Sequence, residues 1–456
     1  MNIFETIVPQ ENVKKQKTII EGQSPELKEY LKASLVNLNE TRNVKDFVYD
    51  NESALKISNR LVEYCIDNED SAGFLLAMLL KSDYSILFKP KESQELAPLI
   101  LPDADIETLD ILYENKDALI KSLAIEKNTA MAWLAFSEGK LYQLTLINDE
   151  YIYSRLSSWS YAKFKGLINS NYIVDFSFDD TIKDRGTVRQ LYPEEYAKQE
   201  KDVINMLSDN TIFLPSVTTS LCIVKDMELS RYPHNLYLDG HGELIAKKIP
   251  VTNVLSTEWL LSVRSEYLVK RNYSKSIWIP TDSSDFAISY LYGNIEDTIN
   301  QNSFSIFQSV KLDQPLSSDI NIVCSHGGEN ISEVQVVSQK TSKTGDLNTI
   351  VGRGRILIFF VCYSGSMKAE FFRNNVTSLI KTFISKGYSA VIAPFWALDV
   401  TVPKYWLPEF LKSFETGDTL DKAVYKANMK VNEKYPTPAA WACLHLYGNP
   451  LIKKEM

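Results

Sequence analysis

The last third of the chain alternates short apolar runs with longer segments of helical periodicity. The apolar runs read "SIWIP", "INIVC", "ILIFFVC" and "SAVIAPF", and they lie between residues 276 and 395. Strands that are apolar along their whole length are buried on both faces, so this pattern predicts a mostly parallel sheet flanked by helices. Ligands bind to such sheets at the carboxyl ends of the strands, so the residues that follow each run are the first candidates for a site.

Helices are expected between and after these runs. One helix should begin with Ser283 or Ser284 as its N-cap, and Asp418 should cap another, because short polar side chains are preferred at that position. Two more helices are predicted at residues 371–387 and 403–417. Together they would cover both faces of the sheet.

Two regions precede the alternating one. Residues 1–127 contain four helix-like segments without a fixed repeat period, "SAGFLLAMLLK" among them. Residues 128–156 contain three aromatic and aliphatic runs separated by turn signals, which predict a three-stranded meander. The segment "LYPEEYAKQEKDVINML" predicts a helix, and "SLCIVKDMEL" and "NLYLDGHGELIAKKIP" predict further strands. We therefore expect a helical N-terminal region (1–127), a middle region (128–274) and the alternating region (275–456).

Two reactive side chains lie where apolar runs of the last region end. His326 follows "INIVC" and is itself followed by glycine, and Cys362 ends "ILIFFVC". A thiol attacks as a thiolate, and a neighbouring imidazole can take its proton. The two side chains need only lie on neighbouring strand ends. The pattern predicts acyl transfer through a thioester, with His326 as the base and Cys362 as the nucleophile.

The small residues around this pair fit the same chemistry. A tetrahedral oxyanion needs backbone N–H donors at its own position. Gly327 and Gly328 allow a tight turn that brings an N–H near the substrate carbonyl, and the N–H of Cys362 can be the second donor. Ser364 and Gly365 keep the turn after the nucleophile small.

The remaining cysteines and histidines lack such a setting. The chain has five cysteines, an odd number without a CxxC pair, which argues against a disulfide framework and against a zinc site. His241, in "DGHGE", is expected to lie in a structural turn. Cys222 and Cys443 are expected to pack in the interior, and so is Cys324, although its position two residues before His326 would also let it line the site. His234 and His445 have no nucleophile motif nearby in the sequence, and His445 lies inside the strand-like run "WACLHLYG".

The composition indicates a soluble globular protein. Hydrophobic residues make up 45% of the chain and the net charge is −9, which does not favour nucleic acid or an anionic membrane as partner. We find neither a signal peptide nor an apolar run near the roughly 18–20 residues that a membrane span needs. A cytoplasmic protein without metal or cofactor is therefore expected.

Several motifs, taken in their order, resemble the CHAT domain of bacteria, a branch of the caspase-like (clan CD) cysteine proteases that also includes separase. The segment "SHGG" resembles the histidine motif of that family, and "ILIFFVCYSGSM" resembles its nucleophile strand. The segments "KGYSAVIAPFWALDV" and "PAAWACLHLYGNP" resemble its Trp-x-x-Asp segment and its closing strand. The likeness covers about residues 130–456. Val361 and Tyr363 depart from the usual Ala and acidic residue beside the cysteine, and Asn449 replaces the usual Asp.

The resemblance implies a caspase-like α/β fold whose first half (128–274) is inactive and whose second half (275–456) is catalytic. It implies peptide-bond hydrolysis by His326 and Cys362, with an oxyanion hole made by the N–H groups of Gly327 and Cys362. Trp396 and Asp399 would then lie near the substrate groove.

The resemblance leaves substrate specificity open. Relatives read an acidic or a basic side chain before the scissile bond. Asp282, Asp285 and Asp399 could form an acidic pocket, or they could cap helices and stabilise turns, which N-cap preferences favour. Bacterial relatives are triggered proteases in anti-phage systems, associated with gasdermins or with CRISPR effectors. Residues 1–127 would then bind an activating protein or effector complex.

Two other functions compete with a protease. One is a catalytically idle scaffold that keeps the fold for regulation. The other is a cysteine amidase or transferase that acts on a small substrate. The joint presence of His326, Cys362 and their glycines favours the protease, since a scaffold needs none of them.

Overall fold

The computed structural model of the chain describes the following residues: 59, 62–69, 71–81, 127–137, 139–156, 176–177, 189–190, 192–263, 267–281, 285–327, 333–337, 342–365, 368–370 and 375–456. The helix expected from "SPELKEYLKASLVNL" lies outside them, as does the one expected from "IETLDILYENKDALIKSLAIEK" except for its last residue. Among the described residues, no helix combines the length and the apolar character that crossing a membrane requires.

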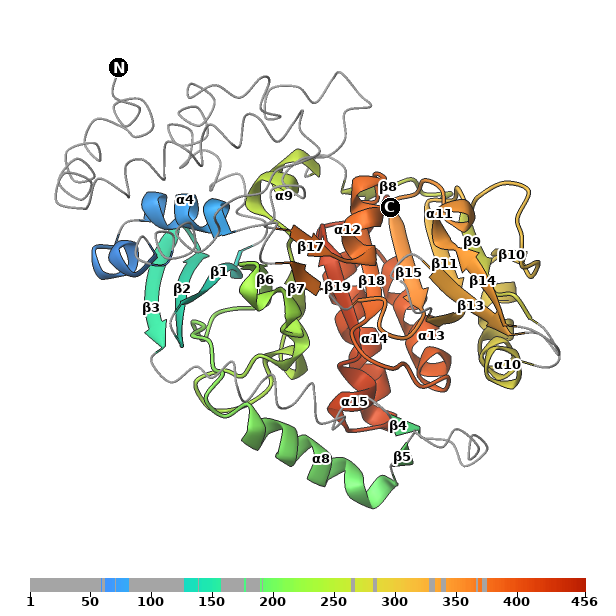
Figure 1. Cartoon of the computed structure of the whole chain (residues 1–456), viewed down its shortest axis with the longest axis horizontal. Coiled ribbons are helices and arrows are strands. Elements are labelled where there is room, and N and C mark those ends of the chain that lie inside the picture. Colours follow the sequence, from blue (N-terminus) through green and yellow to red (C-terminus); the bar gives the residue numbers. More distant parts are fainter. Residues whose placement is uncertain are drawn as a thin grey trace.

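Eleven strands of the described residues form one continuous sheet that runs through the middle and the last region of the chain (Figure 1). In spatial order they are β10 (Ser305–Phe307), β9 (Lys275–Trp278), β11 (Ile320–Cys324), β15 (Ile356–Phe360), β18 (Ala390–Pro394), β19 (Leu444–Gly448), β7 (Val251–Asn253), β6 (Ser220–Lys225), β1 (Thr129–Ser137), β2 (Lys140–Ile147) and β3 (Glu150–Leu156).

The sheet is mostly parallel, as predicted. The five strands from β10 to β18 run parallel to one another, and β19 runs antiparallel to β18. β19, β7, β6 and β1 are again mutually parallel, and β1, β2 and β3 form the predicted antiparallel meander. Strand β19 lies between β18 and β7 and therefore joins the strands of the middle region to those of the last region.

Helices cover both faces, because successive side chains of each buried strand point to opposite cores. In β15, Ile356, Ile358 and Phe360 belong to one core, and Leu357 and Phe359 belong to the other. The first core also contains side chains of α8 (Pro193–Met206), α10 (Phe286–Gln301), α13 (Val402–Glu415), α14 (Leu420–Lys434) and α15 (Pro438–Trp441). The second contains side chains of α4 (Ser71–Lys81), α9 (Thr257–Val263), α11 (Leu347–Ile350) and α12 (Leu379–Ser385), and Figure 1 shows the two groups on opposite sides of the sheet.

Two predicted caps are wrong. α10 has Asp285 as its N-cap, whose carboxylate accepts the N–H of Ile288 at 3.2 Å, and its helix therefore starts later than the serines suggested. α14 has Thr419 as its N-cap. Asp418 instead accepts hydrogen bonds at 2.5 Å from Ser413 of α13 and from Lys426 of α14, so this carboxylate links the two helices.

Two predicted elements differ as well. Of the helix expected at 371–387, residues 371–374 lie outside the described residues, 375–377 form strand β17 and pair with β16 (Lys368–Glu370), and the described helix is α12 (Leu379–Ser385). The segment "NLYLDGHGELIAKKIP", expected to form strands, instead begins within one short 3-10 helix, His234–Leu236, and contains a second, Ile245–Lys247. Between them, Leu238 forms isolated bridges with Leu244 and with Thr211.

Candidate active site

Two neighbouring parallel strands deliver the predicted histidine and cysteine to one edge of the sheet. β11 and β15 pair in register, with Cys324 opposite Phe360 at their carboxyl ends. His326 and Cys362 each lie two residues beyond these ends. A side-chain carbon on Gly327 would lie 2.8 Å from the carbonyl oxygen of Cys362, so the backbones of the two segments pack directly against each other. Only glycine fits this contact without a shift of one of the two segments.

The imidazole of His326 is held by a carboxylate. Its Nε2 lies 3.0 and 2.9 Å from the two carboxylate oxygens of Asp285, at the N-terminus of α10. The side chains of His326 and Asp285 are 17% and 2% exposed. Because an ionised carboxylate can only accept hydrogen bonds, the proton of a neutral imidazole belongs on Nε2. Nδ1 is then the nitrogen that can accept a proton from a nucleophile.

Cys362 is the one partly exposed cysteine of the five, and all five are described. Burial raises the pKa of Cys222, Cys324 and Cys443, which keeps these thiols protonated. Buried thiols of this kind are inert, whereas an accessible one can react. The prediction that these three cysteines pack in the interior is confirmed.

A backbone N–H contacts the sulfur of Cys362. The N–H of Leu398, in the loop before α13, donates to Sγ at 3.4 Å, and Sγ lies 3.9 Å from the carbonyl oxygen of the same residue. A donated hydrogen bond favours the thiolate. Within the described part of the chain, no hydrogen bond joins Sγ to His326.

The turn that follows the nucleophile is pinned against the end of β18. The N–H of Ser364 donates to Val361 at 3.2 Å, and the N–H of Tyr363 donates to the carbonyl of Trp396 at 3.1 Å. The N–H of Gly365 donates to the carbonyl of Pro394 at 2.7 Å. A side-chain carbon on Gly365 would lie 2.9 Å from that carbonyl, so a larger residue would push the turn away from the sheet.

The other predicted site residues have local partners. The ring of Trp396 is buried, and its Nε1 donates to the carbonyl of Ala439 at 2.8 Å. The carboxylate of Asp399 is buried and accepts the N–H and the hydroxyl of Thr401 at 2.8 and 2.6 Å. Asp282 lies outside the described residues, and so does Gly328. A substrate-binding role for Trp396, Asp399 and Asp282 stays a prediction.

The sequence does not predict the contact between Asp285 and His326. Asp285 was noted as a candidate pocket acid or helix cap, and the structure places it as a cap and as the partner of the histidine. One feature of the sequence points to Asp285: it lies just before the helical run of α10, which follows β9, a neighbour of β11 in the sheet. The Leu398 N–H had no signal at all, since a backbone donor depends on loop geometry alone.

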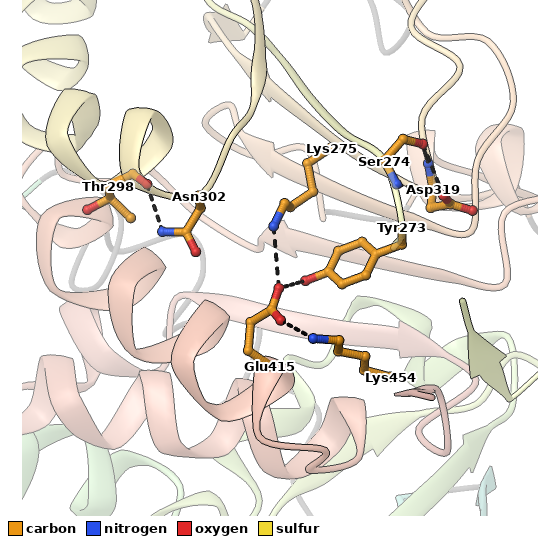
Figure 2. Close-up of polar contacts among 8 residues, drawn as sticks. All are labelled: Tyr273, Ser274, Lys275, Thr298, Asn302, Asp319, Glu415 and Lys454. Atoms are coloured by element: carbon orange, nitrogen blue, oxygen red, sulfur yellow. Dashed lines mark hydrogen bonds and ion pairs between the residues drawn. The ribbon is translucent and has the colours of Figure 1, made fainter. Parts of the chain in front are cut away.

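A polar cavity lies where β9 and β10 begin, at the amino ends of the strands, whereas His326 and Cys362 follow carboxyl ends. It has a volume of about 430 Å³ and is lined by Lys275 and Glu415 among others. Figure 2 shows the carboxylate of Glu415 between Tyr273, Lys275 and Lys454, which donate to it at 2.5, 3.3 and 2.5 Å. The carboxylate attracts both ammonium groups, so the cluster ties α13 to β9 and the C-terminal segment. Among the described residues, no three His, Cys, Asp or Glu side chains are arranged to hold a metal ion.

Comparisons with known proteins bear on the fold. No protein-family model matches the sequence, and no curated protein matches it either. The structure is similar to two crystal structures of the separase–securin complex of Saccharomyces cerevisiae. One match has 13% identity and a TM-score of 0.57, and covers 95% of this chain and 38% of the other. The second has 12% identity and a TM-score of 0.52, with coverages of 94% and 40%.

This chain therefore spans less than half the length of the chains that it matches. Identities this low show the fold and nothing finer. The predicted relation to the CHAT branch stays a prediction. The chain has the expected caspase-like α/β fold, in which a large, mostly parallel sheet is flanked by helices.

Proposed function

We propose that this protein is a cysteine endopeptidase that uses His326 and Cys362 to hydrolyse peptide bonds of a protein substrate. The observation that carries the proposal is the meeting of the two motifs at adjacent strand ends, where Gly327 packs on the backbone of Cys362. Such carboxyl ends are where α/β sheets place their sites. The caspase-like fold is consistent with a protease, but it supports the proposal only at the level of the fold.

The reaction follows from the groups present. Nδ1 of His326 accepts the thiol proton of Cys362, and Sγ attacks the peptide carbonyl to form a tetrahedral oxyanion. The N–H groups of Gly327 and Cys362 are the candidate donors to that oxyanion. Collapse of the oxyanion expels the amine, which takes the proton from His326. Water, deprotonated by the same imidazole, then cleaves the thioester to a carboxylate and restores the thiol.

Asp285 completes the site as a positioning residue. Its carboxylate fixes the ring of His326 and its tautomer, and it stabilises the imidazolium that forms while the proton resides there. The aspartate is held in turn by the N–H of Ile288, so the first turn of α10 sets the orientation of the histidine.

Intact-mass titration with a peptidyl electrophile tests the proposal. Wild type should gain one adduct, whereas Cys362→Ala and His326→Ala should gain none or react far more slowly. Cys443→Ala is the matched control, because it removes a buried cysteine and should leave the adduct in place. An adduct that survives Cys362→Ala would contradict the proposal.

The wider role is also a proposal. On the motif resemblance, we place the protein in bacterial anti-phage defence. It would act in the cytoplasm as a triggered protease associated with a gasdermin or with a CRISPR effector. An activating protein would bind through residues 1–127. Support of a general kind comes from the similar structures, in which separase is in complex with a second protein, securin. The titration repeated with a candidate partner tests this role, since labelling should become faster when the partner is added.

One observation favours the alternative of an idle scaffold. The sulfur of Cys362 accepts a hydrogen bond from the N–H of Leu398, and His326 contacts Asp285. The two candidate catalytic side chains therefore each have another partner. A protein that never labels, either alone or with its partners, would be such a scaffold. A protein that labels only with a partner would instead be a protease at rest.

A further inference from the structure

Two large exposed aromatic side chains directly follow residues of the candidate active site in the sequence. Tyr363 directly follows the nucleophile Cys362 and is 42% exposed. Phe286 directly follows Asp285, the partner of His326, and is 58% exposed. Single exposed aromatics are common on protein surfaces, but these two each adjoin a residue of the same site.

Tyr363 is held in a conformation that its side chain disfavours. Its φ is +61°, in the left-handed region, where a bulky residue is an outlier and where turns favour glycine or asparagine. The hydrogen bonds of the turn to Trp396 and Pro394 hold the backbone there. Backbone strain of this kind persists mainly at functional sites. The ring of Tyr363 is nevertheless 42% exposed to solvent, next to the candidate nucleophile.

Phe286 is part of a stacked pair on the first turn of α10. Its ring lies 6.1 Å from that of Tyr290, with an angle of 18° between the rings. Stacking limits the freedom of both rings before anything binds, and rigid aromatics lose little entropy when they bury an apolar partner. The pair therefore forms a preformed apolar surface that starts one residue after Asp285, the partner of the histidine.

The described carboxylates near the site, those of Asp285 and Asp399, already have hydrogen-bond partners. The side chain of Asp285 is 2% exposed and contacts His326, and Asp399 is bonded to Thr401. A buried carboxylate with such partners offers little charge to a basic substrate side chain. The two aromatic side chains of Tyr363 and Phe286 are more exposed than these carboxylates.

We propose that Tyr363 and the Phe286–Tyr290 pair bind a large apolar side chain of the substrate, at the residue whose carbonyl is attacked. The inference rests on the proposed function for the identity of the attacked bond. The substrate class is then a polypeptide with Phe, Leu or a similar residue before the scissile bond, rather than one with Arg or Asp there.

Binding to the inactive Cys362→Ala protein tests this specificity apart from catalysis. Fluorescent hexapeptides that differ at one position (Phe, Leu, Arg or Asp) are titrated against it. We expect the Phe and Leu peptides to bind at least tenfold more tightly than the charged ones. Adding Tyr363→Gly should remove most of this preference without lowering the melting temperature, because glycine relieves the strained φ. Adding Phe286→Ser should weaken binding too.

Tyr267→Ser serves as the matched control, since Tyr267 is 40% exposed at β8 (Leu268–Val269), away from the site, and its loss should change nothing. Tighter binding of the Arg or Asp peptide, equal binding of all four, or a preference that survives Tyr363→Gly and Phe286→Ser would overturn the inference. If Cys362 of wild type labels neither alone nor with a candidate partner, while the Phe and Leu peptides still bind more tightly, the proposed catalysis is rejected and the apolar site is kept.

Discussion

At the scale of single residues, Asp285 has two tasks that one substitution can separate. Its carboxylate caps α10 through Ile288 and contacts His326. Asn keeps an oxygen that can accept the cap hydrogen bond but loses the charge that stabilises an imidazolium. We expect Asp285→Asn to keep the melting temperature and to slow labelling of Cys362 roughly tenfold or more, since general acid–base catalysis contributes about 10²–10⁴-fold.

The matched control for this change is Asp346→Asn, which alters the capping aspartate of α11 in the same way and lies outside the site. Its labelling rate should equal that of wild type. Labelling that is equally fast in Asp285→Asn would show that the aspartate only caps its helix. The dependence of the labelling rate on pH, measured for both variants, separates an effect on the histidine from a general loss of structure.

Gly327 gives a second prediction at the residue scale. A methyl group there would lie 2.8 Å from the carbonyl oxygen of Cys362, so Gly327→Ala must move one of the two strand ends. We expect a loss of stability of about 1–3 kcal/mol, which is typical of overpacking, and a slower reaction of Cys362. Urea denaturation and labelling kinetics measure the two effects.

Gly293→Ala is the contrasting variant. Gly293 lies within α10, where an added carbon meets no atom within 4 Å, and alanine should stabilise the helix by about 0.5–1 kcal/mol. If both glycine variants behaved alike, a close contact between Gly327 and Cys362 would not be important for the site.

At the scale of elements, the buried strands were predictable and several connections were not. The runs that became β11, β15 and β18 are apolar at nearly every position, and burial on both faces leaves little else for them to form. The segment 235–250 also contains apolar side chains, but it packs them as short 3-10 helices. Local pattern cannot separate these outcomes, because tertiary packing decides short segments.

In the candidate site, too, some features could be predicted from the sequence and others could not. His326 and Cys362 were predictable because each follows an apolar run and has glycine or serine next to it. The pairing of Asp285 with His326 was not, since it depends on strand order and on where α10 begins. Asp285 caps the helix in place of a serine, and that shift decides which side chain meets the histidine.

The cluster around Glu415 allows a prediction about how elements are joined at low pH. Partial burial raises the pKa of Glu415, but hydrogen bonds from Lys454 and Tyr273 and the charge of Lys275 outweigh it and hold the pKa below the ordinary value of 4.5. A carboxyl group with a depressed pKa contributes stability above its unfolded pKa, and that contribution is lost as the pH falls through the folded pKa.

We therefore expect Glu415→Gln to lower the melting temperature at pH 6–7, with a difference from wild type that shrinks below about pH 4.5, where free glutamate takes up its proton. Glu409→Gln on the same helix is the control, because its partner Lys412 is 3.9 Å away and largely exposed. A difference for Glu415→Gln that is constant from pH 7 to pH 3 would mean that packing, rather than charge, makes the contribution.

At the scale of the whole molecule, one sheet connects regions that the sequence suggested as separate. The closing strand β19 lies between β18 and β7, so the middle region and the last region share a core. The described part of the N-terminal region also joins that core, since Phe74, Ala77 and Met78 of α4 are buried with side chains of the sheet. The predicted boundary near residue 127 is therefore best tested through α4.

The contact that makes this test possible is a buried ion pair between α4 and the end of β6. Nζ of Lys81 lies 3.5 Å from the carboxylate of Asp226, and their side chains are 2% and 0% exposed. Burial raises the pKa of Asp226, while the charge of Lys81 and the N–H groups of Phe136 and Leu229 oppose that rise. Removing the lysine would leave a buried carboxylate without its counter-charge.

We expect Lys81→Met to destabilise the whole protein by about 3–5 kcal/mol, the usual cost of breaking a buried pair. Adding Asp226→Asn should restore part of the loss, because it removes the uncompensated charge. Lys430→Met, which breaks an exposed pair with Glu433, should barely shift the melting temperature. If α4 belongs to the common core, hydrogen exchange in Lys81→Met should quicken in α4, β1 and β6 together. Faster exchange confined to α4 would instead show that the N-terminal region is a separate unit, as the sequence predicted.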